Sequence, residues 1–264
     1  MKVKLICFLV VFSTLFCSED SLADKLTIIT STSLIPSNPS TKMLEITQES
    51  LNIIPGFSKC HRIIVFDGVF HRQKHREEDY NAYKQNVMEL TKTHPAFANT
   101  TLVFCKEHKH LARALEEGMQ HVKTPFIFVH QHDFKIRKPV DSFGIIRSME
   151  ENPNLKHIRL HRKWNKPAGM DYYVDEEIEG VSYVPLCRTF GWSDNDHFTR
   201  KDYYEQFIFP KIKRNMPMEH FLNPLEREMT LNDPKNHVLF GTYLYGKKGD
   251  GNYLIHLNGK RWKS

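Results

Sequence analysis

The segment best equipped for chemistry lies at residues 130–133, where His-Gln-His-Asp directly follows an apolar run at residues 126–129. A carboxylate beside an imidazole is a donor set that can hold a divalent cation such as Mn²⁺. Alternation along an extended chain puts Gln131 and Asp133 on one side and His130 and His132 on the other. On spacing alone, the rival interpretation is a polar strand end whose imidazoles only form hydrogen bonds.

Four short apolar segments would position these groups. They read LTIIT (residues 26–30), HRIIVF (61–66), TLVFC (101–105) and FIFV (126–129), and such runs are typical of strands buried on both faces. Helix-like segments separate them, which predicts an α/β fold with a mainly parallel central sheet flanked by helices. Because ligands bind at the carboxyl ends of such strands, Asp67 and residues 130–133 are expected at one edge of the sheet.

The second half of the chain alternates less regularly. Strands are expected at residues 157–161, 181–185, 238–244 and 253–257, and helices at residues 202–207 and 218–229, the last interrupted by Pro224. No segment has the composition of a linker, so residues 24–264 are expected to form a single domain.

The N-terminus has the layout of a secretory signal peptide. A basic start at residues 1–4 precedes an uncharged apolar run at residues 5–17, and Ser21-Leu22-Ala23 offers the small residues that a signal peptidase prefers. The apolar run is shorter than the ~20 residues that span a bilayer as a helix. We therefore expect residues 1–23 to be a cleaved signal peptide, with an uncleaved signal anchor as the alternative.

The composition is that of an ordinary globular protein. Of 264 residues, 40% are hydrophobic and 26% are charged, which excludes collagen-like and wholly disordered chains. The net charge of +6 comes from scattered basic residues, which predicts weak attraction to anionic ligands and no nucleic-acid groove. Beyond the signal region, which takes Cys7 and Cys17, only Cys60, Cys105 and Cys187 remain, enough for one intrachain disulfide at most.

The ordered set of motifs resembles nucleotide-sugar glycosyltransferases of the GT-A type. A first strand (LTIIT) leads to a polar loop, a second (IIVFDG) ends in an acid, and the helix HLARALEEGMQHV precedes TPFIFVHQHD, which stands where the family has its Asp-any-Asp metal motif. DNDHFTRKDYYEQF, MEHFLNP and YLIHLNGKR are similar to later segments of the family. The resemblance covers most of residues 26–261 and implies a single GT-A domain.

On the donor side, the resemblance implies that Asp67 contacts the nucleoside and that Asp133 is the surviving acid of the metal motif. Gln131 replaces the first acid and would lie near the donor; an amide is a weaker ligand, so affinity for Mn²⁺ or Mg²⁺ is in question. His132 or a water could compensate, or the enzyme could work without metal. His256 stands where related enzymes supply a histidine to the metal or diphosphate, although a hydrogen-bonded core histidine is the alternative.

For the leaving diphosphate, Lys260 and Arg261 could neutralise the developing charge, with a solvated basic tail as the alternative. Inverting transfer needs a general base, and the resemblance favours Glu219, with Asp194 and Asp196 as the other candidates. Each of these acids could instead serve a helix terminus or a polar loop.

On the acceptor side, Trp192 could stack on a sugar face, or it could belong to the core.

The favoured function is therefore a secreted or lumenal nucleotide-sugar glycosyltransferase of the hexosyltransferase class, acting on a hydroxyl of a glycan or glycoprotein. No nucleic-acid partner is expected, and membrane contact is expected only through an uncleaved N-terminal segment. Two alternatives stay open: a metal-dependent hydrolase using His130, His132, Asp133 and His256, and a non-catalytic nucleotide- or sugar-binding module, which the replacement at Gln131 would favour.

Overall fold

The structure is a computed structural model that describes residues 22–169, 171–212 and 217–262. The expected signal peptide therefore lies outside the described residues, apart from Leu22 and Ala23, and so do Cys7 and Cys17. Leu22 is buried against the core. Among the described cysteines no disulfide forms, because Cys60, Cys105 and Cys187 are all buried as free thiols.

The first half of the chain builds four parallel strands in the order β3-β2-β1-β4. Their continuous apolar runs are almost fully buried in β1, β2 and β4, as expected for strands covered on both faces. The elements of this half are β1 (Leu26–Thr32), α2 (Lys42–Leu51), β2 (His61–Phe66), α3 (Glu77–Thr93), β3 (Thr100–Phe104), α4 (His110–Met119), β4 (Phe126–Gln131), β5 (Phe134–Ile136) and α5 (Ser142–Glu151).

The second half extends the same sheet as β9-β6-β10-β8-β7 and makes it mixed. β9 runs antiparallel to both β4 and β6, so β4 and β6 point the same way. The elements of this half are β6 (His157–Arg159), β7 (Val174–Asp175), β8 (Leu186–Thr189), β9 (His197–Arg200), α6 (Lys201–Tyr203), α7 (Phe209–Lys211), α8 (Met218–Asn232), α9 (His237–Phe240), β10 (Thr242–Tyr245) and β11 (Leu254–His256).

Of the strands expected in the second half, two differ from the prediction, and the strands β7 and β9 are not predicted at all. Residues 181–185 are not a strand; β8 begins at Leu186 instead, after Pro185, which has no amide N–H for a sheet hydrogen bond. The expected strand at residues 238–244 is divided. Its first part is the short helix α9, Gly241 ends that helix in the left-handed region (φ 56°), and only then does β10 begin.

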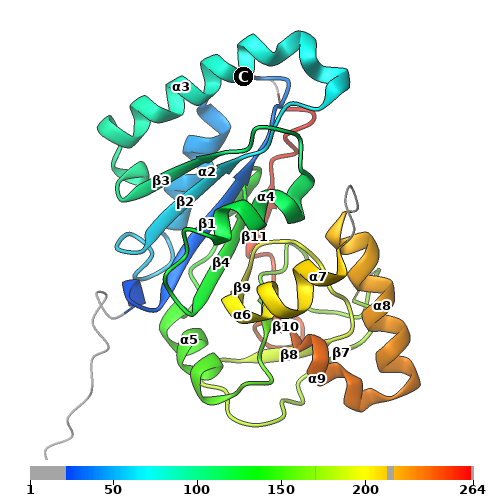
Figure 1. Cartoon of the computed structure of the whole chain (residues 1–264). Helices are drawn as coiled ribbons and strands as arrows, with labels where there is room; N and C mark the ends of the chain where they lie inside the picture. Colours follow the sequence, from blue (N-terminus) through cyan, green and yellow to red (C-terminus); the bar gives the residue numbers. More distant parts are fainter. Residues whose placement is uncertain (1–21, 170, 213–216, 263–264) are drawn as a thin grey trace, which may run out of the picture.

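Helices cover both faces of the parallel half (Figure 1). Ile29, Ile63 and Ile127 pack in one buried cluster with α4 and with apolar residues of α6 to α8. Neighbouring strand residues point the other way, toward the cluster that includes the apolar residues of α5 and toward the one that holds Tyr80 and Tyr83 of α3. Nowhere in the described part does a helix combine the length and the apolar character needed to cross a bilayer.

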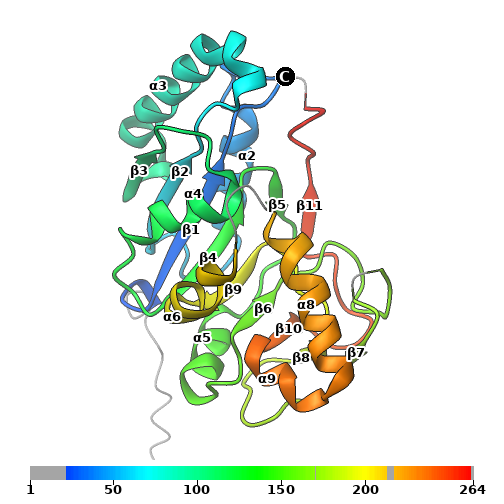
Figure 2. The ribbon, with the colours of Figure 1, turned by 45° about the vertical axis from the view of Figure 1, so that its right-hand side comes forward.

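The C-terminal segment returns to the parallel half. β11 pairs antiparallel with β5, and Figure 2 shows the two strands side by side at the edge of the molecule. Since β5 begins three residues after the end of β4, this pairing brings His256 to the carboxyl end of the central strands.

Candidate functional site

A pocket of about 220 Å³ opens where the strand order reverses. From β1 the chain proceeds to β2 and β3 on one side, whereas β4 joins the other side of β1. In open α/β sheets this switch point leaves a crevice at the carboxyl ends of the strands. The crevice is lined by Ser31, Thr32, Ser33, Asp67, His108, His110, Leu111, Ala114, Gln131 and His132. Asp67, Gln131 and His132, which the sequence places at one edge of the sheet, are thus among the residues that line one cavity.

Asp67 forms part of the wall and also holds two loops together. One carboxylate oxygen accepts the amide N–H groups of Gly68 (2.8 Å) and Lys109 (2.7 Å). The other lies 2.8 Å from Nδ1 of His108, which must donate because its second neighbour, at 3.2 Å, is the Gly68 carbonyl. Asp67 therefore holds the turn at Gly68 and at the same time lines the pocket.

Gly68 permits this close approach of the two loops. A Cβ at this position would lie 2.1 Å from the carbonyl carbon of Glu107 and 2.4 Å from the amide nitrogen of His108. We expect Gly68→Ala to lower the free energy of unfolding by about 1–3 kcal/mol, measured by urea denaturation, because backbone rather than a flexible side chain must move. Ala98→Ser adds one atom at an exposed position and should change stability by less than about 0.5 kcal/mol. Equal stability of Gly68→Ala and wild type would contradict the contact.

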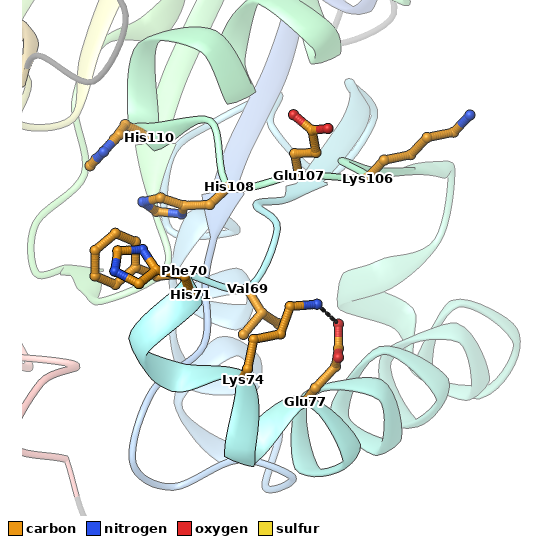
Figure 3. Close-up of a pocket in the computed structure, with 9 residues that line it drawn as sticks. All are labelled: Val69, Phe70, His71, Lys74, Glu77, Lys106, Glu107, His108 and His110. Carbon is orange, nitrogen blue, oxygen red and sulfur yellow. Dashed lines mark hydrogen bonds and ion pairs between the residues drawn. The ribbon is translucent and has the colours of Figure 1, made fainter.

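A second hollow of about 520 Å³ adjoins the first and shares His108 and His110 with it. Figure 3 shows the imidazole of His108 pointing toward Phe70, with His110 on the same side of the hollow, while Lys74 is turned to its ion-pair partner, Glu77. The ring centroid of His108 lies 4.2 Å from that of His110 and 5.1 Å from that of Phe70. Beyond Asp67 the crevice therefore has aromatic walls, which suit a planar ring.

On the opposite rim, the side chain of Gln131 meets a pair of acids. Its amide nitrogen donates to the backbone carbonyl of Asp194 at 2.7 Å. One carboxylate oxygen of Glu219 accepts from the Ser193 hydroxyl at 2.6 Å and from the Asp194 amide at 3.4 Å. Burial and then the charge of Glu219 raise the pKa of Asp194 to about 7. Two carboxyl groups held this close share a proton near neutral pH, which suits general acid–base chemistry.

Asp133 and His256 are in contact, but most of the atoms with which they could bind a metal ion already take part in hydrogen bonds. One carboxylate oxygen of Asp133 accepts from Nε2 of His256 (3.0 Å) and from the Gly259 amide (3.1 Å). Nδ1 of His256 lies 3.4 Å from the guanidinium of Arg162, which can only donate. In this arrangement Nδ1 of His256 accepts from Arg162 and Nε2–H donates to Asp133.

His132 is turned away from that pair. Its Nδ1 lies 3.2 Å from the Ser31 carbonyl and must donate to it. Burial lowers the pKa of His132, so its imidazole is neutral. Within residues 22–169, 171–212 and 217–262, no three histidine, cysteine or acidic side chains converge in a way that could hold a metal ion. The expected ligand set of His132, Asp133 and His256 is not assembled around one point.

Lys260 and Arg261 directly follow Gly259 and are exposed. Arg162, which no sequence motif singles out, is linked to Asp133 through its contact with His256. None of the ion pairs found among the described residues involves any of these three cations. The basic residues at this rim are therefore available to an anionic ligand.

Two expected site residues belong to the interior instead. Asp196 is fully buried, with a carboxylate oxygen 2.6 Å from Nδ1 of His130, which is buried as well. Trp192 is also fully buried, and its indole packs against the imidazole of His157 at 5.0 Å. An acceptor can reach neither side chain, so the expected base role of Asp196 and the expected stacking role of Trp192 do not fit their surroundings.

Comparison with known proteins identifies the fold but no close relative. No protein-family model matches the chain, and no curated protein matches its sequence. Among solved structures, the mannosyltransferase PcManGT from Pyrobaculum calidifontis, in complex with GDP-Man and Mn²⁺, matches 90% of this chain and 58% of its own at 12% identity and a TM-score of 0.50.

The structure of residues 1–349 of TarS from S. aureus is similar at 11% identity and a TM-score of 0.51. The match covers 87% of this chain and 59% of that chain. The complex of these TarS residues with UDP-GlcNAc matches 87% of this chain and 60% of that chain at 10% identity and a TM-score of 0.50. The chain thus spans less than two thirds of each of these solved chains. The likeness shows the fold: a single α/β domain of the GT-A type, as the sequence predicted.

Proposed function

We propose that this protein transfers a sugar from a nucleoside diphosphate to a hydroxyl group of a glycan or glycoprotein. The observation that carries the proposal is the crevice at the switch point, with Asp67 on one rim and, on the other, Gln131 beside the carboxyl groups of Asp194 and Glu219. A fold shared with nucleotide-sugar glycosyltransferases supports it. A nucleotide-binding site and a general base at opposite ends of one crevice are what such a transfer requires.

In the proposed orientation the nucleoside lies against Asp67 and the aromatic walls formed by Phe70 and His108. The diphosphate extends past Gln131 and His132 toward Asp133. The sugar then lies near the acids at residues 194 and 219. The acceptor oxygen bonds to the anomeric carbon, the bond from that carbon to the diphosphate breaks with its electron pair going to the diphosphate, and the acceptor proton passes to the carboxyl pair.

Trp164 is proposed for the acceptor side in place of Trp192. Its indole is 52% exposed, and it lies two residues beyond Arg162. Its loop is fixed to the turn at residues 247–252 by backbone hydrogen bonds, among them Asn252 N–H to the Lys163 carbonyl at 2.6 Å. An exposed aromatic ring on a fixed loop suits stacking against a sugar. A location in the secretory pathway remains part of the proposal and rests on the predicted signal peptide.

The donor site is tested by thermal shift with UDP, GDP and CMP, each with and without Mn²⁺. A ligand at a hundred times its Kd stabilises the native state by about 2.7 kcal/mol, and about 2–4 °C is gained per kcal/mol for a domain of this size. We expect UDP or GDP to raise the melting temperature by roughly 5–10 °C. Asp67→Asn should abolish most of this shift, because it removes the negative charge that faces the nucleoside. The remaining amide oxygen can still accept from the backbone N–H groups of Gly68 and Lys109.

Glu78→Gln, at an exposed position of α3, is the matched control and should shift as wild type does. Melting without nucleotide reports whether each variant is folded. If no nucleotide raises the melting temperature and no nucleotide sugar is turned over, the proposed function is wrong.

A further inference from the structure

The donors around Asp133 do not suit a divalent cation. Mg²⁺ and Mn²⁺ prefer several oxygen ligands, carboxylates among them, in a regular shell. Here Gln131 can offer only the neutral carbonyl oxygen of its amide, whose nitrogen donates to Asp194, and one oxygen of Asp133 already accepts two N–H groups, from His256 and Gly259. This leaves the second oxygen of Asp133 as the anionic ligand that Gln131, Asp133 and His256 can offer together.

His256 does not complete such a shell. Its Nε2 donates to Asp133, and its Nδ1 accepts from Arg162 at 3.4 Å. A cation bound at either nitrogen would displace one of these contacts. At Nδ1 it would also lie next to the guanidinium, so two positive charges would be brought together.

The same region is well supplied for an anion. Arg162 carries five N–H donors and spends one contact on His256. Lys260 and Arg261 directly follow Gly259, whose amide N–H donates to the carboxylate of Asp133. Three cations therefore lie on segments that contact Asp133 through His256 and Gly259, and within the described residues none of the three forms an ion pair with an acid. The surplus of positive charge is of the size that a diphosphate carries.

We propose that this protein holds the diphosphate of its donor without a divalent metal ion, using Arg162 and the basic segment at Lys260 and Arg261 in its place. The inference rests on the proposed function. A guanidinium can bind two phosphate oxygens in parallel, and it keeps its charge throughout the reaction. These cations stabilise the charge that the leaving diphosphate gains as the bond to the sugar breaks.

Calorimetric titration of the full chain with UDP and with GDP, in EDTA and then in Mn²⁺, tests the proposal. For the nucleotide that binds, the Kd should agree within about twofold between the two conditions. Arg162→Gln should weaken binding of that diphosphate by about tenfold or more and leave binding of the corresponding nucleoside unchanged. Arg162→Lys keeps the charge but not the forked geometry, so its affinity for the diphosphate should lie between those of wild type and Arg162→Gln.

Lys166→Gln is the matched control, because it removes a positive charge from an exposed position on the same loop and should bind as wild type does. Thermal melting without nucleotide shows whether each variant is folded. Binding that requires Mn²⁺, or an Arg162→Gln variant with unchanged affinity, overturns the inference and leaves the proposed function intact. Failure of UDP and GDP to bind in either buffer overturns the proposed function itself.

Discussion

Glu219→Gln is expected to lower the rate of sugar transfer by about 10²–10⁴-fold while nucleotide binding stays within about twofold of wild type. The side chain lies at the start of α8, where its carboxylate is held by the hydroxyl of Ser193 and the amide of Asp194. Glutamine keeps this shape and can still accept these two hydrogen bonds, but it cannot take a proton from an acceptor hydroxyl. Initial rates with a saturating nucleotide sugar, compared with calorimetric binding, separate the two effects.

The pH dependence follows from the neighbouring acid. The pKa of Asp194 is raised to about 7, first by burial and then by the charge of Glu219. Below that pH the carboxyl pair holds a proton, so kcat/KM should fall on the acid side of about pH 7. In Glu219→Gln the charge that raises the pKa of Asp194 is gone. The acid-side fall in any residual kcat/KM should therefore occur at lower pH.

The same shift bears on stability. A carboxyl group whose pKa is raised on folding binds more protons in the native state, so its contribution weakens as the pH rises from 3.8, the ordinary value, through about 7. Asp194→Asn should therefore gain stability over wild type at pH 8 and lose that advantage at low pH, although its transfer rate falls. Urea unfolding at the two pH values measures this.

Glu228→Gln makes the same substitution at an exposed position of α8 and serves as the control. It should retain the wild-type rate and the wild-type pH profile. A Glu219→Gln variant whose transfer rate stays within threefold of wild type would remove Glu219 from the proposed role.

The parallel half of the fold and one side of the crevice can be predicted from sequence because they depend on local patterns. Continuous apolar runs identify β1, β2 and β4, and the residues that follow such runs must lie at one edge of the sheet. This suffices to place Asp67 and Gln131 around one pocket. The proximity of Asp133 and His256 is predicted from the resemblance to GT-A enzymes and not from local patterns, since the two residues are far apart in sequence.

What the sequence does not predict depends on contacts between distant segments. Trp192 and Asp196 stand in a polar stretch that reads as a loop, but β9 carries that stretch into the middle of the sheet. Arg162 follows β6, which belongs to the strand expected at residues 157–161. Because β6 runs in the same direction as β4, residues beyond its end reach the edge that holds Asp133, but this becomes apparent only once β9 is known to lie between them.

The largest effect on stability is expected at Asp196. This carboxylate joins the end of β4 to the segment before β9: one oxygen lies 2.6 Å from Nδ1 of His130, and the other accepts the amide N–H of Gln131 at 3.0 Å. Asp196→Ala leaves both donors buried without a partner. Removing one member of a buried pair of this kind costs about 3–5 kcal/mol, so urea unfolding should show a loss in that range. Asp196→Asn can still accept from the Gln131 amide and should lose less.

A double-mutant cycle separates this contact from general effects of burial. Nε2 of His130 has no hydrogen-bond partner among the residues that the structure describes, so His130→Phe removes little besides the contact to Asp196. If the pair is the cause, Asp196→Ala should cost less in the His130→Phe background than in wild type, with a coupling energy of about 1–3 kcal/mol. An Asp196→Ala variant that is as stable as wild type but has lost transfer would contradict this structural role and return Asp196 to the candidates for the general base.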